Sequence, residues 1–111
     1  MSFVRVLSTS DLEVGTAKMV SVDGNRILVV KDRDGAVWAT SALCTHARVY
    51  LVLPELTDDG LIECPAHGAM YCPRDGSVRQ GPALTPLTTY KTAISNDDVL
   101  VDLAVPVEAK G

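Results

Sequence analysis

Cys44-Thr45-His46 is followed further along the chain by Cys64-Pro65-Ala66-His67-Gly68. Each stretch offers one thiol and one imidazole, in the spacings C-x-H and C-x-x-H. The 111 residues include only two histidines and three cysteines, so this clustering takes in both histidines. Because thiolate and imidazole ligands together suit zinc and iron, we predict one metal centre held by Cys44, His46, Cys64 and His67.

The way the ligands are paired helps to choose the metal. Structural zinc fingers usually pair cysteine with cysteine and histidine with histidine, whereas each stretch here mixes the two. A binuclear iron-sulfur cluster with two cysteines and two histidines has both cysteines on one iron and both histidines on the other. Two mixed loops can hold such a cluster from both sides. A zinc site with the same four residues, and a chance clustering of filler cysteines, are the alternatives.

Composition limits the classes of protein to which the chain can belong. Apolar residues make up 47% and charged residues 22%, which excludes a disordered chain. The net charge of -4 argues against nucleic-acid binding. Apolar runs such as Ile27–Val30 are too short to cross a membrane, and the first residues do not look like a secretion signal. We therefore expect a cytoplasmic protein with no membrane partner.

Short strands separated by turns indicate an all-β fold. The turn signals are dipeptides of the Asp-Gly type, at residues 23–24, 34–35, 59–60 and 75–76, with a weaker one at Asn96-Asp97. A single helical turn is expected at Ser10-Asp11, a core position for Trp38, and a frayed tail over residues 105–111. Strands are expected over Val4–Leu7, Ile27–Val30, Ala36–Ala39, Leu61–Glu63, Thr88–Ala93 and Val99–Leu103.

The length fits a single domain spanning residues 1–111. Within it, the segment of residues 40–86 differs in character, because it contains all the cysteines and histidines and is rich in proline and glycine. Such loops form little regular structure, and a bound metal centre would hold them in place.

These motifs resemble the signature of Rieske iron-sulfur proteins. The resemblance covers nearly the whole chain. Before the first ligand pair it includes Val37-Trp38-Ala39, and after the second it includes Tyr71, Gly76 and the proline loop Gly81-Pro82-Ala83. The length matches the small ferredoxins of bacterial aromatic ring-hydroxylating dioxygenase systems.

The resemblance implies an antiparallel β sandwich or barrel with a cluster-binding subdomain inserted over about residues 42–84, and one [2Fe-2S] cluster per chain. Cys44 and Cys64 would ligate the buried iron, and His46 and His67 the outer iron at the molecular tip. The protein would be an electron carrier and not itself an enzyme. It would take single electrons from a flavin-dependent ferredoxin reductase and pass them to a terminal oxygenase that hydroxylates aromatic compounds, both docking transiently at the His46/His67 tip.

Other residues bear on the reduction potential of the cluster. High-potential Rieske proteins have a disulfide between their cluster loops and a serine two residues after the second histidine. This chain has no cysteine for that disulfide, and it has Ala69 at the serine position. Fewer hydrogen bonds to sulfur lower the potential, so we expect the low end of the Rieske range, even though Tyr71 could restore a polar contact.

Some features depart from the family pattern or leave alternatives open. Ala47 replaces a frequent glycine, and Cys72, where aspartate is common, is expected to be a small buried or half-buried residue. The apolar stretch Val49–Pro54 is interpreted as a shield over the centre, with a docking patch as the alternative; Arg48 and Met70 could also touch a partner. The second functional hypothesis is a Rieske-like small subunit of an assimilatory nitrite reductase, and the third is a structural zinc module.

Overall fold

The computed structural model describes residues 3–22, 24–43, 50–51, 55–65, 68–81 and 86–107, with side chains described up to residue 102. Within these ranges the chain is almost entirely β structure, as predicted. The single described helix is a 3-10 turn, Thr9–Asp11, where one helical turn is expected. In the described ranges no helix is long and apolar enough to cross a membrane.

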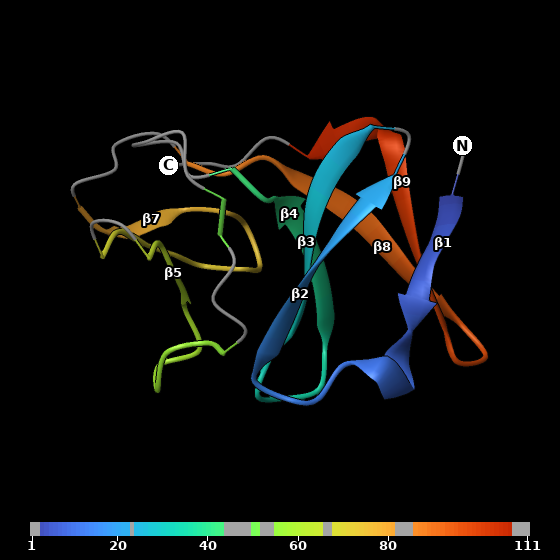
Figure 1. Cartoon of the computed structure of the whole chain (residues 1–111), viewed down its shortest axis with the longest axis horizontal. Helices are drawn as coiled ribbons and strands as arrows, with labels where there is room; N and C mark the ends of the chain where they lie inside the picture. The colour runs from blue at the N-terminus through green and yellow to red at the C-terminus, as the bar shows by residue number, and fades with distance from the viewer. Residues whose placement is uncertain are drawn as a thin grey trace.

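Two antiparallel sheets make up the fold (Figure 1). The larger sheet has the strand order β1-β9-β8-β4-β3-β2 and curls around one side of the molecule. Its strands are β1 (Phe3–Ser8), β2 (Thr16–Val22), β3 (Asn25–Lys31), β4 (Val37–Ser41), β8 (Thr89–Ser95) and β9 (Asp98–Val107). The smaller sheet has the order β5-β6-β7, with β5 (Ile62–Glu63), β6 (Met70–Tyr71) and β7 (Val78–Gln80). All three of its strands lie between β4 and β8 in the sequence.

The middle of strand β3, Ile27–Val30, is a continuous apolar run because both faces of the strand are buried there. Ile27 and Val29 belong to a core cluster with Val99 and Val101. Leu28, from the opposite face, belongs to a second cluster, which also takes in the small sheet. A strand covered on both sides is a continuous apolar run rather than an alternating one. This second cluster packs the small sheet and its loops against the large sheet.

Two expectations were wrong, and one strand was missed. Strand β9 runs to Val107, and Pro106 and Val107 pair with β8, so the tail is not frayed from residue 105; residues 108–111 lie outside the described ranges. Strand β2 was not predicted, because Lys18 and Ser21 interrupt its apolar pattern. Trp38 is half-buried rather than fully in the core, and its indole N–H donates a hydrogen bond to Asp32 Oδ2 at 2.7 Å.

Candidate metal centre

The second ligand stretch lies at the end of the β5-β6 hairpin, in which Ile62 pairs with Tyr71. The Ala69 carbonyl accepts a hydrogen bond from Cys64 N at 2.8 Å, and the Cys64 carbonyl accepts one from Gly68 N at 3.1 Å. Gly68 has a φ of +73°, which a residue with a Cβ rarely adopts. These bonds fix the backbone on both sides of residues 65–67.

Backbone hydrogen bonds also join the residues that flank the first ligand stretch. Leu43 and Tyr50 form an isolated antiparallel bridge. Leu51 N donates to the Ala42 carbonyl at 2.7 Å. Residues 44–49 therefore connect two points of the chain that are hydrogen-bonded to each other, directly after β4.

Residues at the ends of both ligand stretches pack into one core cluster. Ala42 and Leu51, from the first stretch, share this cluster with Cys64 and Ala69, from the second. Tyr71 and Leu87 belong to it as well, and both are fully buried. The fold thus brings the described ends of two segments that are distant in sequence to one place, as a shared metal centre requires.

Cys64 is the one predicted ligand that the structure describes. Cys64 is 1% exposed and lies among apolar side chains. Cys44, His46 and His67 lie outside the described residues, as do Ala47, Arg48 and the loop residues Pro82 and Ala83. The four-residue ligand set therefore stays a prediction.

The surroundings of Cys64 fit an iron-sulfur cluster. A thiolate ligand in an apolar, water-excluding shell is what such a centre needs on its buried side. Within the described part of the chain, no group of three or more His, Cys, Asp or Glu side chains is placed to hold a metal ion. The described residues therefore offer no competing site.

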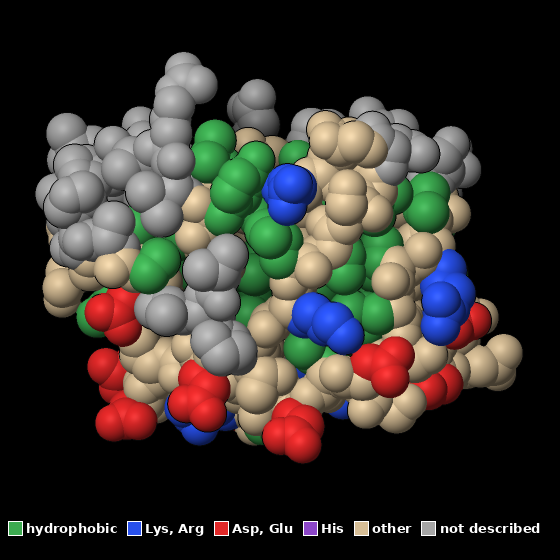
Figure 2. Space-filling model, viewed as in Figure 1, with side chains coloured by type: hydrophobic (Ala, Val, Ile, Leu, Met, Phe, Trp, Pro, Cys, Tyr) green, Lys and Arg blue, Asp and Glu red, His purple; other side chains and the backbone are tan. Residues whose placement is uncertain are grey.

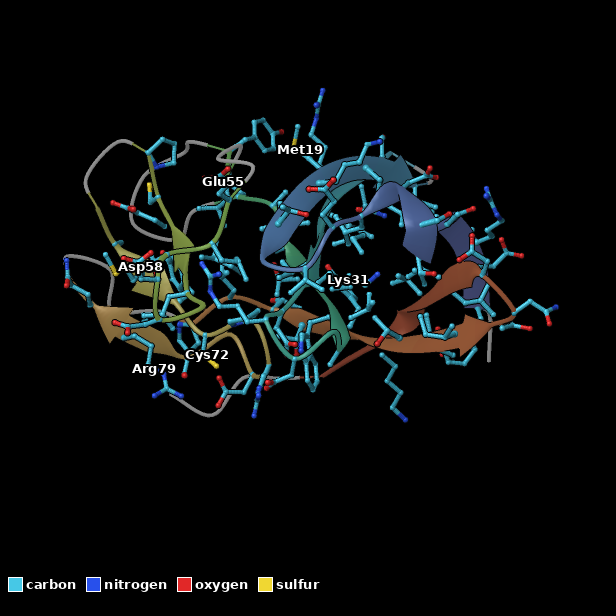
Figure 3. All side chains as sticks on the ribbon, turned by 90° about the horizontal axis from the view of Figure 1, so that it is seen from below. Met19, Lys31, Glu55, Asp58, Cys72 and Arg79 are labelled. Carbon is cyan, nitrogen blue, oxygen red and sulfur yellow. The ribbon has the colours of Figure 1, made fainter. Side chains whose placement is uncertain are left out.

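Cys72 lies apart from this arrangement. It is 9% exposed, in agreement with the expectation of a small buried residue. It lines a pocket of about 340 Å³ together with Asp58 and Arg79. Figure 3 shows these three residues on the small-sheet side of the molecule, with Cys72 in the lower half of the view and Met19 at the top.

An ionic and hydrogen-bonded network that the sequence did not reveal joins the two sheets. Arg74, between β6 and β7, places Nη2 3.1 Å from Asp34 Oδ2 and Nε 3.9 Å from Asp32 Oδ2. Asp32 Oδ1 accepts hydrogen bonds from Asp34 N at 2.9 Å and from Ala36 N at 3.0 Å. Burial raises the pKa of Asp32, but these bonds, with that from Trp38 and the charge of Arg74, outweigh it and hold the pKa below its usual value. In the sequence, the only sign of this network was the turn dipeptide Asp34-Gly35.

Comparison with known proteins identifies the family. Residues 2–91 match the model of the Rieske [2Fe-2S] domain. The chain belongs to the Rieske [2Fe-2S] family. This Rieske domain is 33% identical over 104 residues to the ferredoxin subunit of biphenyl dioxygenase from Pseudomonas sp. strain KKS102, a match that covers 94% of both chains.

Solved structures agree with this assignment. The ferredoxin of carbazole 1,9a-dioxygenase from Nocardioides aromaticivorans IC177 has a TM-score of 0.83 and 31% identity, and the match covers 99% of this chain and 100% of that one. A ferredoxin solved in complex with the oxygenase of carbazole 1,9a-dioxygenase has a TM-score of 0.81 and 28% identity, covering 97% and 95% of the two chains.

Family membership confirms the expected cofactor and class of protein. The Rieske domain carries one [2Fe-2S] cluster. The protein is an electron-transfer component and not itself a catalytic subunit, since the ferredoxin components of oxygenase systems match nearly its whole length.

Proposed function

We propose that this Rieske ferredoxin takes single electrons from a flavin-dependent ferredoxin reductase and delivers them to a terminal Rieske oxygenase that hydroxylates aromatic compounds. The observation that carries the proposal is the match of nearly the whole chain to ferredoxin components of aromatic dioxygenases. One of those ferredoxins was solved in complex with an oxygenase. For the compartment we propose the cytoplasm, which fractionation of the native cells would test.

In this proposal Cys44 and Cys64 hold the buried iron, and His46 and His67 hold the outer iron. The bound cluster supplies uptake and release of one electron at a time. The burial of Cys64 among apolar side chains supports its place on the inner side, because it keeps water from the thiolate. The two imidazoles would form the port through which electrons enter and leave, with partners docking there in small, transient interfaces.

A low reduction potential suits this role. Ala69 is fully buried beside Cys64 in the same core cluster and has no hydroxyl to donate to a cluster sulfur. Rieske potentials extend from about -150 to +300 mV, and fewer hydrogen bonds to sulfur move the value toward the lower limit. A low-potential carrier can receive electrons from a flavin and reduce an oxygenase.

The first experiment is electron paramagnetic resonance of the dithionite-reduced protein, with iron and zinc measured on the same sample. We expect about two irons per chain and an average g-value below that of all-cysteine [2Fe-2S] proteins. Cys64→Ser should abolish the signal, whereas Cys72→Ser, a matched change at the third cysteine, should leave it intact. Zinc without iron, or a signal that survives Cys64→Ser unchanged, would contradict the proposed ligand set.

The second experiment tests electron delivery. The reduced protein is mixed in a stopped-flow instrument with purified oxygenases from the biphenyl dioxygenase system of Pseudomonas sp. strain KKS102 and the carbazole 1,9a-dioxygenase system of Nocardioides aromaticivorans IC177. We expect oxidation of the ferredoxin by at least one of them. A cluster-loaded protein that reduces neither oxygenase would overturn the proposed role.

A further inference from the structure

The two ligand stretches are attached to different sheets. Ala42, just before the first stretch, donates its backbone N–H to the Arg26 carbonyl on β3 at 3.3 Å. The second stretch continues β5, a strand of the small sheet, and Cys64 lies directly after that strand. A movement of the small sheet relative to the large sheet would therefore change the distance between the two halves of the predicted ligand set.

Two arginines cross the boundary between the sheets, one from each side. Arg74, between β6 and β7, reaches the carboxylates of Asp32 and Asp34 in the turn that joins β3 to β4. From that same turn, Arg33 Nη2 donates a hydrogen bond to the Thr57 carbonyl at 3.0 Å, in the turn that leads to β5. We call Asp32, Arg33, Asp34 and Arg74 the clasp.

Carboxylates from both sides of the boundary meet around the clasp. Asp32 and Asp34 line the pocket of about 340 Å³ together with Asp58 and Asp59, which lie shortly before β5. Figure 2 shows acidic side chains gathered along the lower edge of the view, the end at which the β3-β4 turn lies in Figure 1. Loss of a clasp arginine would therefore remove an attraction and leave these carboxylates to repel one another.

The small sheet depends on contacts of this kind because its own strands are short. They have two, two and three residues, whereas strands commonly have roughly five or six. The core cluster around Cys64 and the hydrogen bond from Leu87 N to the Gly76 carbonyl also hold it. Where the chain leaves β4 and returns to β8, Ser41 N donates to the Thr88 carbonyl at 2.8 Å. The small sheet can therefore move away while the pairing of the large sheet stays intact.

We infer that the clasp controls a local opening in which the small sheet separates from the intact large sheet, and that the [2Fe-2S] cluster is gained and lost through this open state. Opening moves Cys64 and the β5-β6 hairpin away from the first ligand stretch, and closing returns Cys64 to the apolar core cluster. The inference rests on the place proposed above for Cys64 in the ligand set, and not on the electron partners.

Two variants weaken the clasp from opposite sides of the boundary. Arg74→Gln removes the cation that faces Asp32 and Asp34, and Arg33→Gln shortens the side chain that reaches Thr57. Both arginines are exposed, so the large sheet should still fold in either variant. Arg74→Lys keeps the charge and should retain part of the wild-type behaviour.

An ion pair elsewhere on the molecule provides the matched control. Arg5→Gln breaks the pair between Arg5 Nε and Asp98 Oδ1, which are 2.8 Å apart and join β1 to β9 within the large sheet. The side chain of Arg5 is 55% exposed and that of Arg74 is 59% exposed, so water screens the two pairs to a similar degree.

Two rates are measured on the cluster-loaded proteins under anaerobic conditions. The first is the loss of iron to an excess of chelator, followed by the decay of visible absorption. In that step the chelator takes the iron, and the released thiolates take up protons from water. The second is hydrogen–deuterium exchange by mass spectrometry, compared between residues 68–81 on the small-sheet side and residues 25–41 of the large sheet.

We expect Arg74→Gln and Arg33→Gln each to raise the rate of iron loss and the exchange rate of residues 68–81 about fivefold. This factor corresponds to about 1 kcal/mol, the upper end of the range for an exposed ion pair. Exchange of residues 25–41 should stay at its wild-type rate in both variants. Arg5→Gln should change neither iron loss nor the exchange of residues 68–81.

Three results would overturn the inference. Wild-type iron loss and wild-type exchange in both clasp variants would show that the clasp controls no opening. An equal rise of exchange in the two ranges would show that the sheets open only together. Faster exchange of residues 68–81 without faster iron loss would show that the cluster leaves by another route. Failure of the wild type to reduce either oxygenase would instead count against the proposed function and leave this inference standing.

Discussion

Gly76 is the position where the smallest change should have the largest structural effect. Its φ is +75°, and a Cβ placed on it would lie 2.2 Å from the Leu87 carbonyl oxygen and 3.0 Å from the Leu87 carbonyl carbon. Both are backbone atoms, which cannot move aside as the end of a flexible side chain can. The Gly76 carbonyl also accepts the hydrogen bond from Leu87 N at 2.8 Å. Gly76→Ala should therefore displace Leu87, a fully buried member of the core cluster around Cys64.

The expected cost has three parts. A left-handed backbone conformation costs a residue with a Cβ about 1 kcal/mol. Weakening a buried backbone hydrogen bond costs about 1 to 3 kcal/mol. Disturbed packing of Leu87 adds about 1 kcal/mol. The total, roughly 3 to 5 kcal/mol, is a large share of the stability of a typical domain. At about 4 °C per kcal/mol for this chain length, the melting temperature should fall by roughly 12 to 20 °C.

Two other glycines separate the causes of this effect. Gly60 has a φ of +79° but nothing within 4 Å of its Cβ position, so Gly60→Ala should show the conformational cost alone, about 1 kcal/mol. Gly81 has open space and no positive φ, so Gly81→Ala should be nearly neutral.

The assay is thermal unfolding of the cluster-loaded proteins, followed by circular dichroism under anaerobic conditions at one scan rate. A second readout is the temperature at which the visible absorption of the cluster is lost. We expect both to fall most for Gly76→Ala. A melting temperature for Gly76→Ala within error of that for Gly60→Ala would refute the argument, because the contact with Leu87 would then have no energetic consequence.

Three further predictions concern the network and the centre. Asp32→Asn should lower the urea midpoint at neutral pH and shift the fluorescence of Trp38, the single tryptophan, to longer wavelength. Because the folded pKa of Asp32 lies below the ordinary value of 3.8, its contribution is present above that pH and lost as the pH falls through the folded pKa. The difference between variant and wild type should therefore vanish in acid; a difference that grows in acid would contradict this sign. Ala69→Ser should raise the midpoint potential by roughly 20 to 65 mV in voltammetry, the one-electron equivalent of a hydrogen bond of about 0.5 to 1.5 kcal/mol, and an unchanged value would place the side chain away from the sulfur. His46→Cys should abolish the Rieske-type resonance spectrum, and retention of that spectrum would exclude His46 as a ligand.

Much of the fold was predictable because its signals are local. The strands β1, β3, β4, β5, β8 and β9 were anticipated from short apolar runs bounded by turn dipeptides. Strand β2 was missed because it lies at the edge of the sheet and pairs along its length only with β3, so it tolerates Lys18 and Ser21 in its sequence. Strands β6 and β7 have two and three residues, and only their pairing defines them. An apolar pattern of that length does not by itself separate a strand from a loop; β5 is as short, but the turn dipeptide Asp59-Gly60 directly before it marked its position.

The sequence by itself determined the family and the cofactor, because the spacing of Cys44, His46, Cys64 and His67 is written in consecutive residues. It also determined the all-β class, since strand periodicity and turn chemistry act over a few residues. The tertiary structure alone decided that Arg26 lies over Tyr50, that Arg74 reaches Asp34, and that Gly76 lies against Leu87. Each of these contacts joins residues that are distant in the sequence, so no local pattern encodes them.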